Sequence, residues 1–106
     1  MKNKEELYDR LVSKCSGFER KGKTIPYTSA NGHIFSQLNK DGELGLRFSN
    51  EVQEKYKQKF GTGHFKSYGA IMKGYVLMPE SMWDDLDLLA NYMNESYDYV
   101  KSLEEK

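Results

Sequence analysis

Two glycine turns lie close together in this chain, and they limit its possible folds more than any other feature. Asn31-Gly32 is the typical pair of a type I′ hairpin turn, because both residues tolerate a positive φ. The second turn runs from Asn39 to Gly42, where the glycine suits the left-handed position that closes a three-residue loop with a bulge. The stretches around these turns predict a meander of three antiparallel strands between residues 25 and 48.

Counting outward from each turn predicts the register of the strands. The first turn places Tyr27 opposite Ser36, and the second places Leu38 opposite Leu44. Pro26 cannot donate to a ladder, so the first strand is expected to be an edge, bulged or only partly paired there. The two registers place the same apolar residues on one face of the sheet. A slip of either register by one residue would distribute these residues over both faces. This face is expected to contain Ile25, Tyr27, Ile34, Leu38, Leu44, Leu46 and Phe48.

Helical periodicity appears on both sides of the meander. Apolar residues at helical spacing predict helices over residues 4–16, 50–60 and about 86–103. Residues 70–78 form an apolar run that predicts a fourth strand, and Pro79 ends it. A chain of 106 residues has the size of one domain. The sequence therefore predicts a single domain over residues 1–106 with an α+β fold. An antiparallel sheet, the three-strand meander plus a further strand, is flanked by helices in the order α-β-β-β-α-β-α.

Charge and cysteine content bear on the class of protein. Sixteen basic residues balance sixteen acidic ones, which argues against nucleic-acid binding by overall attraction to phosphate. Cys15 is the only cysteine, and this favours a reducing compartment. The charged N-terminus does not resemble a signal peptide, and no stretch approaches the roughly 20 apolar residues of a membrane span. We expect a cytoplasmic protein that does not associate with a membrane.

The residues that most often carry chemistry are isolated in this sequence. His33 and His64 have no second histidine or cysteine at metal-ligand spacing. Cys15 lies on the apolar stripe of the first helix without a nearby histidine, which is typical of a structural thiol. The sequence therefore predicts no catalytic residue, no metal and no cofactor.

One arrangement of aromatic and basic residues is a candidate binding site. The inferred register places Phe35 opposite both Thr28 and Arg47, on the sheet face away from the leucines. On the fourth strand, Lys73 is the residue least suited to a core, and Tyr75 would share its face. Phe35, Arg47, Lys73 and Tyr75 could then bind an anion, a nucleic acid or an acidic partner. The alternative is that a helix covers this face and the four residues are structural.

Three segments carry a resemblance to a known family. They are residues 27–35 (YTSANGHIF), 42–47 (GELGLR) and 67–76 (SYGAIMKGYV), the last followed by Pro79-Glu80 and an acidic final helix. Together they resemble the N-terminal domain of the TfoX/Sxy competence-regulator family. The resemblance implies a secretion-chaperone-like α+β fold and a regulatory context. It implies no catalytic residue that could be assigned to a position in this chain.

Three hypotheses about function follow. A non-enzymatic regulatory or protein-interaction module with an unidentified protein partner comes first, because the resemblance favours regulation and no motif favours chemistry. A binder of a small ligand or nucleic acid through the aromatic and basic face comes second, and an uncharacterised enzyme comes third. A ligand-sized pocket would favour the second hypothesis, whereas a flat apolar patch shared by two chains would favour the first. The chain is expected to be a monomer or a homodimer.

Overall fold

The computed structural model describes residues 4–22, 25–67 and 69–104. The helices in this part of the chain are α1 (Lys4–Ser13), α2 (Asn50–Phe60), the short 3₁₀ helix η1 (Glu80–Asp84) and α3 (Leu86–Lys101). The strands are β1 (Tyr27–Ala30), β2 (His33–Leu38), β3 (Leu44–Arg47), β4 (Lys66–Ser67), β5 (Ala70–Ile71) and β6 (Tyr75–Leu77). The predicted α+β fold and element order are confirmed, with one addition, the small β4–β5 ribbon.

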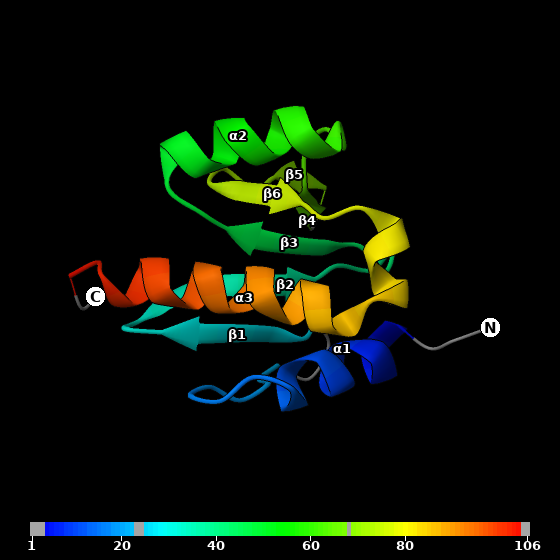
Figure 1. The fold of residues 1–106 in the computed structure, drawn as a ribbon, viewed down its shortest axis with the longest axis vertical. Coiled ribbons are helices and arrows are strands. Elements are labelled where there is room, and N and C mark those ends of the chain that lie inside the picture. Colours follow the sequence, from blue (N-terminus) through cyan, green and yellow to red (C-terminus); the bar gives the residue numbers. More distant parts are fainter. Residues whose placement is uncertain (1–3, 23–24, 68, 105–106) are drawn as a thin grey trace.

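The main sheet is antiparallel, with strand order β1-β2-β3-β6. Helix α3 crosses one face of it and packs on β1, β2 and β3, while α1 packs against α3 (Figure 1). Helix α2 lies along β6, at the opposite end of the sheet from α1 (Figure 1). The β4–β5 ribbon lies behind the sheet in the same view. None of the described helices is long and apolar enough to cross a membrane.

Both predicted turns are present. Asn31 and Gly32 have φ values of 52° and 79°, as a type I′ turn requires, and Gly42 has a φ of 77°. The register after the second turn is also as predicted, because Ser36 pairs with Leu46 and Leu38 with Leu44. Leucines 38, 44 and 46 are buried in the core together with Phe48. The residues of the second turn therefore determine the pairing register of β2 and β3 at the centre of the sheet.

The register between β1 and β2 differs from the prediction. A bulge shifts the pairing between Thr28 and Ser29, so that Tyr27 lies opposite Gln37 and Thr28 opposite Ser36. Phe35 is the extra residue of the bulge, between Ile34 and Ser36, which both have partners in β1. A bulge interrupts the alternation of side chains, so the expectation for Phe35 and Ile34 is reversed. Phe35 is fully buried in the core, whereas Ile34 is 39% exposed.

The apolar run at 70–78 is divided between two sheets. Its first part forms β5, which pairs with β4, and its second part forms β6, which pairs with β3. A turn at Lys73 and Gly74 separates the two strands, and Gly74 adopts a φ of 91°. Lys73 therefore lies in this turn and not on the expected continuous strand.

A buried polar cluster connects α1 to the sheet. The hydroxyls of Tyr8 and Ser36 are 2.6 Å apart, and Ser36 also bonds to the hydroxyl of Thr28. All three residues are fully buried. Because each hydroxyl has a partner, the cluster avoids the cost of an unsatisfied buried polar group.

Candidate functional site

Arg47 and Tyr75 lie opposite each other on β3 and β6. Their neighbours Leu46 and Val76 are fully buried in the hydrophobic core, so alternation places Arg47 and Tyr75 on the other face of the sheet. The Tyr75 hydroxyl donates a hydrogen bond to the carbonyl of Ile34 at 2.7 Å, and the residue is only 7% exposed. The structure thus brings these two predicted site residues together, and the Tyr75 side chain is buried.

The other two predicted site residues lie elsewhere. Phe35 contacts the rings of Phe18 and Tyr97 at centroid distances of 4.9 and 5.7 Å, on the side of the sheet covered by α3. The prediction that it shares a face with Arg47 is wrong, because the bulge turns its side chain into the core. Lys73 is exposed in the turn before β6. The next residue, Gly74, lies close enough to Arg47 that a Cβ there would be 3.9 Å from its side chain.

A groove of about 430 Å³ lies between α2 and the segment that leads into β6. Asn50, Gln53 and Lys57 contribute one wall from α2, at the i, i+3, i+7 spacing that shares one helix face. Lys73 and Tyr75 belong to the opposite wall, so two of the predicted site residues line this groove. Its remaining lining residues are His64, Ile71, Met72 and Gly74. We refer to this hollow as the α2–β6 groove.

The charges in the α2–β6 groove are of one sign. Lys57 and Lys73 contribute two ammonium groups, and the imidazole of His64 can donate a hydrogen bond. None of the described residues that line the groove carries a carboxylate. Within the described part of the chain, neither lysine forms an ion pair. The groove can therefore stabilise an anionic group.

The α2 wall of this groove was not predicted from the amino-acid sequence. The non-core positions of helix 50–60 are polar or charged, which is typical of a solvated helix surface. The signal that could have found the wall is the absence of acidic residues at Asn50, Gln53 and Lys57, although Glu51 and Glu54 stand beside them. No sequence pattern indicates that His64 lines the groove, because only the fold places this residue near α2.

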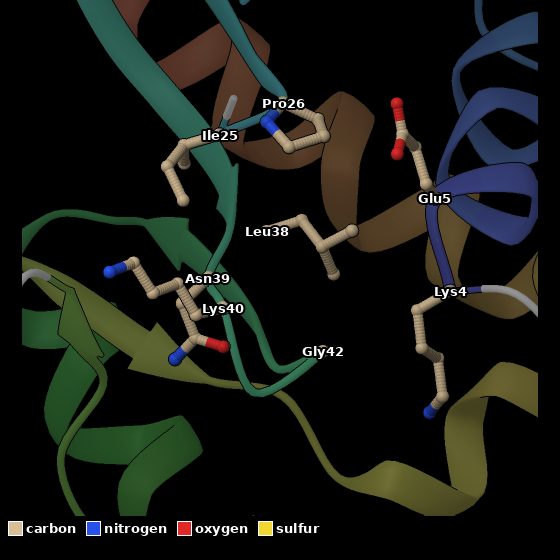
Figure 2. Close-up of a pocket in the computed structure, with 8 residues that line it drawn as sticks. All are labelled: Lys4, Glu5, Ile25, Pro26, Leu38, Asn39, Lys40 and Gly42. Carbon is tan, nitrogen blue, oxygen red and sulfur yellow. The ribbon is translucent and has the colours of Figure 1, made fainter. Parts of the chain in front are cut away.

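A second hollow of about 230 Å³ lies where α1 meets the β2–β3 turn (Figure 2). Lys4 and Glu5 approach it from α1, and their side chains point in opposite directions. Each already has an oppositely charged partner, Lys4 with Glu80 and Glu5 with Arg20. The lining charges are thus largely neutralised, unlike those of the α2–β6 groove. The other lining residues are Ile25, Pro26, Leu38, Asn39, Lys40 and Gly42.

The histidines and the cysteine lie apart from one another in the fold. His33 contacts the carbonyl of Glu104 at 2.9 Å and Arg47 at 3.5 Å, whereas His64 lines the groove. Burial raises the pKa of the Cys15 thiol, which disfavours the reactive thiolate. Among the described residues, no three histidine, cysteine or carboxylate side chains are placed to hold a metal ion.

Three buried tyrosines make stability depend on alkaline pH. Burial, together with the hydrogen bond to Glu95, raises the pKa of Tyr56. Burial raises the pKa of Tyr8 and of Tyr75 from 10.0 to about 12, and Arg47 partly opposes this shift at Tyr75. Above pH 10 the unfolded chain releases these protons while the folded chain keeps them, so stability is expected to fall from pH 10 to 12. Each tyrosine contributes a slope of about 1.4 kcal/mol per pH unit within that window.

Urea denaturation between pH 7 and 11.5 measures this slope. Tyr75→Phe should make the alkaline fall shallower, because one of the shifted groups is removed. An equally steep fall in Tyr75→Phe would contradict the assignment of this titration to Tyr75.

Comparisons with known proteins returned no match: no family model, no curated protein and no solved structure is significantly similar to this chain.

Proposed function

We propose that this protein is a non-enzymatic binding module, and that the α2–β6 groove receives an anionic group of its ligand. The observation that supports this proposal is the lining: Lys57 and Lys73 face a hollow without a carboxylate among its described residues. The volume of about 430 Å³ falls in the range of ligand sites. Charge-assisted hydrogen bonds from the two ammonium groups would hold an oxyanion.

The cellular setting forms part of the same proposal. Resemblance to the TfoX/Sxy N-terminal domain supports a regulatory role, in which binding changes the activity of a partner. The single cysteine supports a reducing, cytoplasmic environment. The protein would then act by recognition, either as a monomer or as a homodimer.

Removal of the two groove lysines tests the proposal. In ¹⁵N-labelled protein, inorganic phosphate and succinate should shift the amide signals of residues 50–57 and 71–75. Lys57→Gln/Lys73→Gln should weaken this binding at least about tenfold, since two charge-assisted bonds are lost.

Lys40→Gln/Lys101→Gln provides the matched control, because it removes the same charge from exposed positions outside the groove. The control should bind both anions as the parent does. Equal losses in both double variants would mean that net charge and not the groove causes the binding, and would overturn the proposal.

A further inference from the structure

We propose that the natural occupant of the α2–β6 groove is an extended segment of a partner protein in which an acidic side chain lies close to an apolar one. This inference rests on the proposed function, because it names the class of ligand for the same site. Three features of the groove distinguish a peptide from a free anion: the orientation of its carboxamides, its exposed apolar surface and its length.

The two carboxamides of the groove are oriented by their hydrogen bonds. Gln53 Nε2 donates to the carbonyl of Phe48 at 2.8 Å and to Asn50 Oδ1 at 3.4 Å. Gln53 Oε1 therefore remains as an acceptor and Asn50 Nδ2 as a donor, with no partner for either among the described residues. A peptide group has one donor and one acceptor, so it matches this pair. A carboxylate only accepts, so a free carboxylate anion such as succinate would leave Gln53 Oε1 unused.

The groove also contains apolar surface that a small anion would leave uncovered. Ile71 is 52% exposed, the highest value among the exposed large hydrophobic residues in the described chain, and Met72 beside it is partly exposed. An apolar side chain of the ligand would remove this surface from water. Tyr75 is only 7% exposed, so its ring is not available for a nucleotide base to stack on. These features favour a peptide over a nucleic acid.

The spacing along α2 gives the length of the segment. Asn50 and Lys57 are separated by two turns of helix, which corresponds to about 10 Å along the axis. An extended chain covers that distance with about three residues, at roughly 3.3 Å each. The peptide backbone would contact Asn50 and Gln53, the acidic side chain would bind between Lys57 and Lys73, and the apolar side chain would cover Ile71.

An array of acetylated, amidated octapeptides tests this inference. Each peptide carries two glutamates and one leucine at varied positions in a glycine–serine background, with glutamate→glutamine and leucine→serine versions as controls. The best peptide should bind in solution at least about tenfold tighter than succinate or phosphate, and both controls should weaken it. Asn50→Ala, at an exposed position, should weaken the peptide several-fold, because it removes the side-chain donor that a peptide carbonyl would accept from.

The outcomes separate this inference from the proposed function. If phosphate and succinate bind through Lys57 and Lys73 but no peptide exceeds them, the peptide inference is overturned and the anion-binding function stands. An octathymidylate oligonucleotide that binds tighter than every peptide would also overturn the inference, in favour of a nucleic acid. If neither anions nor peptides bind in the groove, both proposals are wrong.

Discussion

Phe35→Ala is expected to lower the free energy of unfolding by about 3–5 kcal/mol, the usual cost of removing a buried aromatic side chain. Phe35 is fully buried and packs edge-to-face against Phe18, with Tyr97 beside it. Its removal would leave a cavity between the sheet, α3 and the segment that follows α1. Urea denaturation followed by circular dichroism at neutral pH measures the loss.

Ile34→Ala is the matched control for this prediction. Ile34 is the preceding residue and is 39% exposed, so its truncation should cost less than about 1 kcal/mol. Simple strand alternation without the bulge would give the opposite result, a costly Ile34→Ala and a harmless Phe35→Ala. That reversed order would contradict the bulge.

Gly45 and Phe65 are expected to be strongly coupled. A Cβ at Gly45 would lie 2.5 Å from the ring of Phe65, closer than any relaxed contact allows. Gly45 does not have a positive φ, so Gly45→Ala tests space alone, and we expect it to cost about 1–3 kcal/mol. Phe65 is fully buried against the sheet, and Phe65→Ala should cost about 3–5 kcal/mol.

A double-mutant cycle distinguishes this clash from a general loss of sheet stability. With the ring removed, Gly45→Ala should cost little, so the two free-energy changes should differ from additivity by about 1 kcal/mol or more. Urea denaturation of the parent, the two single variants and the double variant measures the cycle. Additive changes would mean that Phe65 does not rest on Gly45.

The predicted fold was accurate where local chemistry decides the structure. Asn31-Gly32 and Gly42 adopt the positive φ values expected of them, and the pairing of Leu38 with Leu44 follows from the second turn. Ser49 caps α2 through its side chain, and Gly61 ends the helix in the left-handed conformation. These outcomes depend on residues close together in the chain, so the sequence specifies them directly.

The candidate site was only half predictable. Arg47 and Tyr75 share a face because strand alternation holds through β3 and β6, where no bulge intervenes. Phe35 was placed wrongly because a bulge on β2 has no clear sequence signature there. Lys73 lines the groove from a turn, whereas the sequence predicted that it would lie on a strand.

The turns, the helices and the pairing of the core leucines follow from residues that are close together in the chain, so the amino-acid sequence was sufficient to predict them. Three features could be established only from the three-dimensional fold: the side of the sheet that Phe35 faces, the division of residues 70–78 between two sheets, and the α2–β6 groove. Each depends on contacts between distant segments, such as Phe65 on Gly45 and α2 along β6. Residues of α2 and residues 71–75 line one groove only because β6 joins the edge of the meander, next to β3.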